Sequence, residues 1–97
     1  MPAYTIADIE WHDEAKAAEY RKLLGPGLEK YGGRTLVANQ AHGLEGDWKP
    51  QRVVIIEFPS MEALRTWYNS PEHAPALRLR KEGAKSNMIA VERPPAP

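Results

Sequence analysis

The run Val53–Ile56 constrains the fold of this chain more than any other segment. These four consecutive β-branched residues leave a strand no polar face, so a strand over residues 52–58 must be buried on both sides. The helices that the chain supplies can cover only one side of the resulting sheet. We therefore expect a second copy of the chain to cover the other side.

Composition excludes several classes of function. The chain has 97 residues, enough for one domain, and no cysteine, which excludes thiol catalysis, thiolate metal sites and disulfides. Its 13 basic and 13 acidic residues form no basic stripe, so we expect no nucleic-acid partner. No apolar run approaches the ~20 residues of a membrane span, and the N-terminal residues lack a secretory pattern. We expect a cytoplasmic protein without membrane contact.

Strand and helix patterns alternate along the chain in the order β-α-β-β-α-β. Strands are predicted at residues 3–9, 34–38, 52–58 and 87–92. This order is the split-βαβ or ferredoxin-like plan. It predicts one α+β domain over residues 1–93, followed by a proline-rich tail over residues 94–97. The strands, numbered along the chain, should lie in the order 4-1-3-2, with the first and third as parallel central neighbours and the helices on one face.

The helix patterns begin after the capping residues Asp13 and Ser60. We expect the first helix to kink or break at residues 25–27, because Pro26 removes a backbone donor, and to end at Gly32–Gly33 in left-handed conformations. The second helical region restarts at Ser70-Pro71. Pro75 should limit that restart to one turn before a short helix that reaches residue 83.

Two carboxylates, Asp8 and Glu57, are the candidate catalytic residues. Val54, Ile56 and Phe58 are expected to face the helices, so Glu57 should point between two paired sheets. Asp8 would point into the same space between the sheets if Tyr4 and Ile6 of the first strand also point there.

Parallel strands would place both carboxylates at one end of the sheet, and a Leu36–Ile55 pair would bring Arg34 beside Glu57. Close carboxylates in a desolvated cleft can act as an acid–base pair, whereas the guanidinium would bind an anion or keep Glu57 ionised. The alternative is a structural ion network that closes the end of a barrel.

Four further residues are candidate ligand contacts, namely Tyr4, His42, Trp48 and His73. Trp48 lies in the long loop over residues 39–51, where a tryptophan serves as a lid on a pocket or as an anchor on a partner subunit. His42 and His73 could meet in space as proton carriers, or each could be a surface histidine. The three histidines show no metal-ligand spacing, so we expect no metal site.

Several sequence blocks resemble one family, in order and in spacing. They are Tyr31-Gly32-Gly33-Arg34, Leu44-Glu45-Gly46-Asp47-Trp48, Ile56-Glu57-Phe58-Pro59-Ser60 and Trp67-Tyr68-Asn69-Ser70-Pro71-Glu72. Over residues 3–92 the chain resembles the family catalogued as domain of unknown function 1330. The resemblance implies a small bacterial protein of the dimeric α/β-barrel type. Relatives of that fold include cofactor-free monooxygenases, muconolactone isomerase-like enzymes and haem-degrading enzymes, so the fold implies no single reaction.

The chain departs from the family pattern at two places. Residues 37–40 read Val-Ala-Asn-Gln where the family often has Val-Arg-Gly-Gly, and His73 stands where the family usually has tyrosine. Two readings of function follow. The first is a cofactor-independent enzyme, isomerase-like or monooxygenase-like, that acts on a small organic molecule in the barrel cleft. The second is a homodimer without catalytic activity, which binds a small molecule or is structural only.

Overall fold

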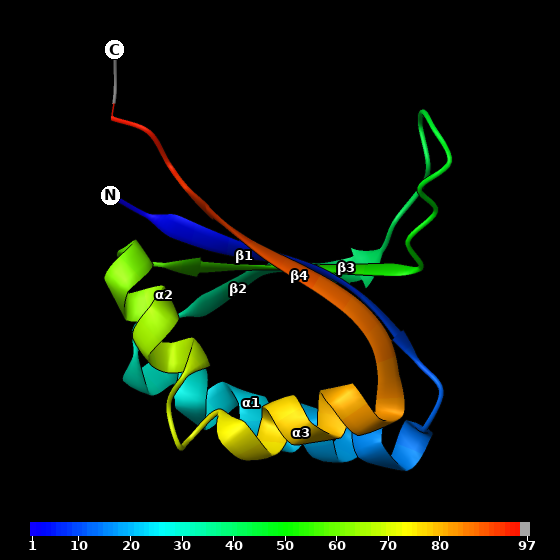
Figure 1. The fold of residues 1–97 in the computed structure, drawn as a ribbon, viewed down its shortest axis with the longest axis horizontal. Coiled ribbons are helices and arrows are strands. Elements are labelled where there is room, and N and C mark those ends of the chain that lie inside the picture. The colour runs from blue at the N-terminus through cyan, green and yellow to red at the C-terminus, as the bar shows by residue number, and fades with distance from the viewer. Residues whose placement is uncertain (96–97) are drawn as a thin grey trace.

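A sheet of four strands carries three helices on one side (Figure 1). The computed structural model describes residues 1–95. The elements are β1 (Ala3–Trp11), α1 (Glu14–Lys30), β2 (Arg34–Gln40), β3 (Arg52–Phe58), α2 (Met61–Tyr68), α3 (Ala74–Gly83) and β4 (Ala84–Glu92). This arrangement confirms the predicted ferredoxin-like α+β class. Residues 96–97 of the predicted tail lie outside the described residues.

The strand order is β2-β3-β1-β4, as predicted, but the strand directions differ from the prediction. β3 runs antiparallel to both of its neighbours, β1 and β2, and β4 runs antiparallel to β1. The expectation that β1 and β3 are parallel is therefore wrong. Helix α1 returns the chain so that β2 runs in the direction of β1, and the following hairpin reverses β3.

Helix α1 runs without interruption through Pro26, so the predicted break at residues 25–27 is absent. Asp13 caps the helix, because its Oδ1 accepts a hydrogen bond of 3.0 Å from the amide of Lys16. After the helix, Gly32 takes the expected left-handed conformation, with φ of 75°. Gly33 does not take the left-handed conformation. A larger residue is disfavoured at this position because its Cβ would lie 2.7 Å from the ring of Phe58.

Serine residues organise the second helical region. Ser60 Oγ accepts from the amide of Ala63 at 3.0 Å and caps α2. Ser70 Oγ donates to the carbonyl of Trp67 at 2.7 Å and accepts from the amide of His73 at 3.2 Å. Residues 71–73 form a turn and α3 begins at Ala74, so the predicted restart, one turn followed by a short helix, is confirmed.

The two faces of the sheet differ in burial. Along β1, Ala3, Thr5, Ala7 and Ile9 are buried under the helices, so the alternate residues lie on the side that no helix covers, here called the open face. Along β3, Ile56 and Phe58 are buried under the helices, as predicted, and the rings of Phe58 and Trp67 pack with centroids 5.0 Å apart.

The open face is apolar at its centre and exposed. Ile89 of β4 is 58% exposed, and Val37 of β2 is 46% exposed. Ile6 pairs with Ile55 on one side and with Ile89 on the other, so these side chains form one continuous patch. A patch of this kind marks an interaction surface. Among residues 1–95, no helix is long and apolar enough to cross a membrane.

Candidate functional site

The structure separates the two predicted catalytic carboxylates. Asp8 pairs with Val53, whereas Glu57 pairs with Tyr4, four residues back along β1. Both carboxylates lie on the open face, as predicted for Glu57 and as left open for Asp8, but the antiparallel direction of β3 puts them toward opposite ends of the strand pair. The predicted cluster of Asp8, Glu57 and Arg34 is therefore wrong as a single site.

Arg34 does lie beside Glu57. Its Nε donates to Glu57 Oε1 at 2.9 Å, and its Nη2 lies 2.8 Å from the same oxygen. The expected Leu36–Ile55 pairing is replaced by Val37–Ile55, because a register shift lies between Thr35 and Val37. This irregularity absorbs one residue, so Arg34 still lies opposite Glu57. Tyr4 faces the same end of the open face as this ion pair.

Asp8 belongs to a separate polar recess at the other end of the open face. Its Oδ2 accepts from Trp48 Nε1 at 3.1 Å, and its Oδ1 accepts from the Asn87 amide at 2.9 Å and from Asn87 Nδ2 at 3.2 Å. Burial acts to raise the pKa of Asp8, but the hydrogen bonds from Trp48 and Asn87 outweigh it and lower the pKa below its usual value. Asp8 is therefore a hydrogen-bond acceptor here rather than a proton donor.

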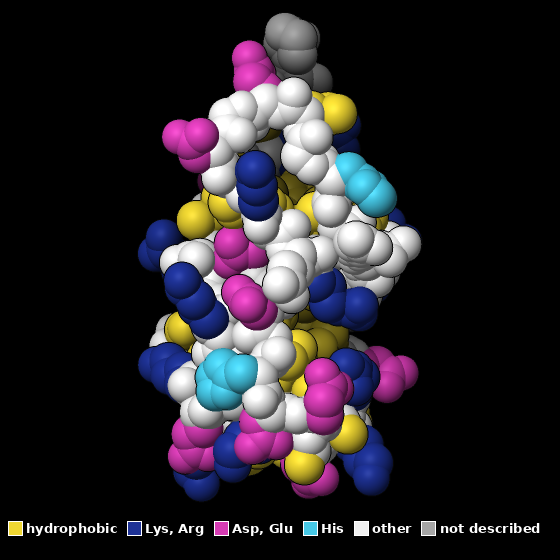
Figure 2. Space-filling model, turned by 90° about the vertical axis from the view of Figure 1, so that its right-hand side faces the viewer, with side chains coloured by type: hydrophobic (Ala, Val, Ile, Leu, Met, Phe, Trp, Pro, Cys, Tyr) yellow, Lys and Arg dark blue, Asp and Glu magenta, His cyan; other side chains and the backbone are white. Residues whose placement is uncertain are grey.

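The recess beside Asp8 has a volume of about 260 Å³ and a mixed, polar lining that includes Lys49, Gln51 and Lys85. Trp48 also lines the recess and is 64% exposed. Figure 2 views the molecule from the right-hand side of Figure 1, where the β2–β3 loop lies, and shows acidic and basic side chains interspersed, with hydrophobic atoms visible in the hollows. No single sign of charge dominates this face.

The predicted meeting of His42 and His73 does not occur. His42 is exposed in the β2–β3 loop, whereas His73 is buried at the turn between α2 and α3, and these segments lie at opposite ends of the molecule (Figure 1). His73 is 1% exposed, so the alternative of a surface histidine is wrong for this residue. Sequence neighbours do not reveal this burial, because His73 lies between polar and small residues.

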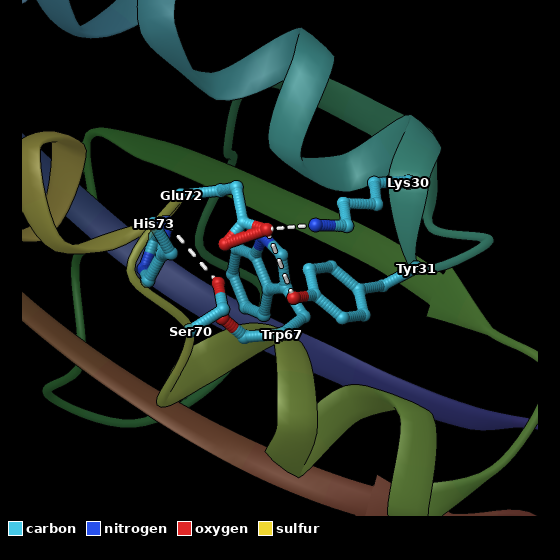
Figure 3. Close-up of polar contacts among 6 residues, drawn as sticks. All are labelled: Lys30, Tyr31, Trp67, Ser70, Glu72 and His73. Atoms are coloured by element: carbon cyan, nitrogen blue, oxygen red, sulfur yellow. Dashed lines mark hydrogen bonds and ion pairs between the residues drawn. The ribbon is translucent and has the colours of Figure 1, made fainter.

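His73 is enclosed by aromatic rings. Its ring centroid lies 4.1 Å from that of Trp67 and 5.6 Å from that of Tyr68. Neither imidazole nitrogen has a hydrogen-bond partner among the described residues, and the same holds for Trp67 Nε1. Burial, aided by the charge of Arg80, lowers the pKa of His73 to about 4, so the ring is neutral at pH 7. Figure 3 shows the imidazole beside Trp67 and Ser70.

A polar contact joins the turn at residues 71–73 to α1. Glu72 Oε1 accepts from Lys30 Nζ and, at 3.2 Å, from the hydroxyl of Tyr31, as Figure 3 shows. The hydrogen bond from Lys30 is the main cause that lowers the pKa of Glu72, and the same bond raises the pKa of Lys30. This contact lies at the surface and holds the end of α1 against the turn before α3.

A further pocket lies between α1 and the helix-covered face of the sheet. It has a volume of about 260 Å³ and is lined mainly by apolar side chains, among them Ile9, Leu24, Leu28 and Val54. We call this the helix-side pocket. Such concave, mostly apolar spaces with a few polar groups are typical of small-molecule sites. The volume of this pocket is smaller than the ~300 Å³ that is the lower end of the usual range for such sites. It therefore suits a small ligand.

The polar groups of the helix-side pocket are Tyr20, Arg21, Thr35 and Arg52. Tyr20 is 7% exposed, and its hydroxyl oxygen accepts from Arg80 Nη1 at 3.2 Å. Arg80 is itself 3% exposed and pairs with no carboxylate among residues 1–95. A buried cation without an anion is costly, so its retention marks this contact as a functional candidate.

Sequence reasoning did not identify Tyr20, Arg21, Arg52 or Arg80 as site residues. A signal for Arg80 does exist. His73, Ala76, Arg80 and Gly83 recur at spacings of three and four, and all four are buried. An arginine in such a stripe indicates a buried polar contact, but nothing in the sequence says that its partner is Tyr20. Within residues 1–95 no group of His, Cys, Asp and Glu side chains is placed to hold a metal ion.

Comparison with known proteins identifies the family. The model of the family described as domain of unknown function DUF1330 matches residues 2–94. The chain belongs to this family. No curated protein gives a significant match.

Solved structures share the fold. A protein of unknown function from Rhodopseudomonas palustris is 23% identical, with a TM-score of 0.77 over 99% of this chain and 84% of that one. A dimeric ferredoxin-like protein of unknown function from Jannaschia sp. is 12% identical, with a TM-score of 0.68 over 96% and 100%. SnoaB, a cofactor-independent oxygenase from Streptomyces nogalater, is 12% identical, with a TM-score of 0.62 over 98% and 95%. At these identities the likeness shows the fold alone.

Proposed function

We propose that this DUF1330 protein is a homodimer joined through its open faces, and that each protomer is a cofactor-independent enzyme acting on a small organic molecule in its helix-side pocket. The dimer is supported by the exposed Ile89, Val37 and Val91 on the open face. Each of these half-exposed side chains forgoes roughly 1 kcal/mol of burial. The structurally similar Jannaschia protein is described as dimeric.

Open-face pairing would cover one recess and leave the other pocket free. Asp8, Trp48, Glu57, Arg34 and Tyr4 would then face the partner subunit, where we assign them interface roles, with Trp48 as an anchor. The helix-side pocket lies on the opposite face of the sheet, so its mouth stays open to solvent in such a dimer. It is therefore the better candidate for a site that exchanges substrate and product.

The observation that carries the proposal is the contact between Tyr20 and the buried Arg80. A guanidinium can only donate hydrogen bonds, so Arg80 occupies an acceptor position of the Tyr20 oxygen and leaves the O–H hydrogen for another acceptor. The Tyr20 hydroxyl donates no hydrogen bond to another described residue. A phenol that is fixed in this way beside a mostly apolar pocket can donate to an oxygen that gains negative charge during reaction.

This arrangement suits a small molecule with an acidic C–H or O–H group: its proton passes to solvent water at the mouth of the pocket, and the Tyr20 hydroxyl donates a hydrogen bond to the enolate or phenolate oxygen that remains. Isomerases that move a proton within their substrate form such an anion. Cofactor-free oxygenases form it as well, and there the anion reacts with dioxygen. Arg80 would act through Tyr20 as a positioning residue, since its positive charge favours electron density on the phenol oxygen. SnoaB, which has the same fold, is described as a cofactor-independent oxygenase, and this likeness supports the reaction class without specifying a substrate.

The test is a small-molecule panel followed by thermal unfolding and by mass analysis of products. A ligand of this pocket should raise Tm in the wild type and should fail to do so in Ala38→Trp, which fills the pocket. Ala18→Trp, on an exposed position of α1 outside the pocket lining, is the matched control. Tyr20→Phe should keep binding and lose turnover.

Two results would change the proposal. Stabilisation by a ligand without any product, under air and over a range of pH, would favour a binding module without catalytic activity. Equal stabilisation of Ala38→Trp and of the wild type would place the ligand elsewhere and overturn the assignment of the site.

A further inference from the structure

The charges around the helix-side pocket all have one sign. Its lining includes Arg21 and Arg52 and no aspartate or glutamate. A third guanidinium, that of Arg80, donates a hydrogen bond to the hydroxyl of the lining residue Tyr20. The ion pairs of residues 1–95 are Lys16–Glu82, Lys30–Glu72 and Arg34–Glu57, so none of these three arginines is neutralised by a carboxylate. In a chain with equal numbers of acidic and basic residues, this is a local excess of positive charge.

The two lining arginines come from opposite walls. Arg21 belongs to α1, next to Tyr20, and Arg52 is the first residue of β3, on the same face of the sheet as Val54. Both arginines are exposed, whereas Tyr20 and Leu28 are buried, so the charges lie at the mouth and the apolar groups lie within. Two guanidinium groups at one mouth repel each other unless an anion lies between them.

We propose that the helix-side pocket takes a small aromatic carboxylate, with its ring among Leu24, Leu28 and Val54 and its carboxylate bound by Arg21 and Arg52. Guanidinium groups match the two oxygens of a carboxylate and make charge-assisted hydrogen bonds. This inference names the substrate class of the proposed enzyme and therefore rests on the proposed function. The volume of about 260 Å³ limits the body of the ligand to about one ring.

The experiment compares three probes by titration calorimetry on the purified full-length protein. Benzoate has both the ring and the charge, benzyl alcohol has the ring alone, and acetate has the charge alone. Benzoate should bind at least roughly tenfold more tightly than either of the others, because only benzoate uses both parts of the pocket. Its affinity should fall as salt concentration rises, since the arginines are exposed to solvent.

Variants then assign the effect to residues. Arg21→Gln and Arg52→Gln should each weaken benzoate binding several-fold and leave benzyl alcohol unchanged, whereas Arg78→Gln, at an exposed position of α3 outside the pocket lining, should change neither. If a variant fails to fold, the salt dependence of benzoate binding to the wild type tests the same charges.

Equal affinity for benzoate and benzyl alcohol, or benzoate binding that is independent of salt, would overturn the carboxylate assignment while leaving the pocket in place. Failure of all three probes to bind, together with equal stabilisation of Ala38→Trp and the wild type by whatever ligand the wider panel yields, would instead overturn the proposed function.

Discussion

Burial of His73 should make the stability of this protein depend on pH between about pH 4 and pH 6.5. The imidazole is 1% exposed, packs against Trp67 and has no hydrogen-bond partner for either nitrogen among the described residues. Burial, with a smaller effect from Arg80, lowers its pKa from 6.5 to about 4. The unfolded chain therefore binds this proton more readily than the folded chain does, at every pH between these two values.

The sign and size follow from linkage. The contribution of His73 is complete above pH 6.5 and is lost as the pH falls toward 4, because the unfolded state gains a proton that the folded state does not. One pKa unit corresponds to ~1.36 kcal/mol. A shift from 6.5 to about 4 lowers the free energy of unfolding by about 2 kcal/mol between pH 7.5 and pH 5, and by about 3 kcal/mol when the pH is below 4.

The assay is urea unfolding of the wild type and of His73→Phe at several values between pH 5 and pH 7.5. Phenylalanine keeps an aromatic ring against Trp67 and cannot titrate, so the variant should lose most of the pH slope. Any cost of overpacking is the same at every pH and does not affect the slope. His42→Phe, at an exposed position, is the control and should keep the slope of the wild type. Equal slopes in the wild type and in His73→Phe would refute the reasoning.

Three further predictions follow from named contacts. Ile89→Lys places a charge at the centre of the open face and should weaken the dimer by about 100-fold or more. Ala18→Lys, on the exposed side of α1, is the control. An unchanged dimer of Ile89→Lys in sedimentation would contradict the assignment of the open face as the dimer interface. Gly33→Ala should cost about 1–3 kcal/mol of stability, because the new methyl meets the Phe58 ring. Gly43→Ala is the control, since its new methyl meets only the Trp48 carbonyl at 4.0 Å, and equal denaturant midpoints of the two variants would argue against the close packing. Arg80→Met should raise the pKa of His73, measured by NMR titration, since the guanidinium disfavours the protonated ring; an unchanged pKa would remove that electrostatic link.

The fold was predictable because its signals are local and periodic. Val53–Ile56 indicated an interior strand, and alternation placed Tyr4, Ile6 and Asp8 together on one face of β1, although it left open which face that was. The cap residues Asp13 and Ser60 marked the correct helix starts. Each of these signals depends on residues within one element, so no knowledge of distant contacts was needed.

The site was less predictable because it depends on strand direction and on contacts between distant elements. Asp8 and Glu57 share the open face, but the antiparallel β3 separates them, and a wrong strand direction was enough to join them in one cluster. Tyr20 and Arg80 are 60 residues apart, and their contact arises only when α3 packs on α1. His73 has polar and small neighbours in sequence, so its burial between Trp67 and Tyr68 becomes visible only in three dimensions.

The most direct test of the account is an NMR titration of the isotope-labelled protein with benzoate, at a concentration where sedimentation gives its mass. We expect a two-chain mass and shift changes concentrated at Tyr20, Leu24 and Arg52, on the helix side of each sheet. Shift changes concentrated at Asp8, Trp48 and Asn87 would place the ligand at the open face instead and contradict the central claim. A one-chain mass at all concentrations would contradict the dimer.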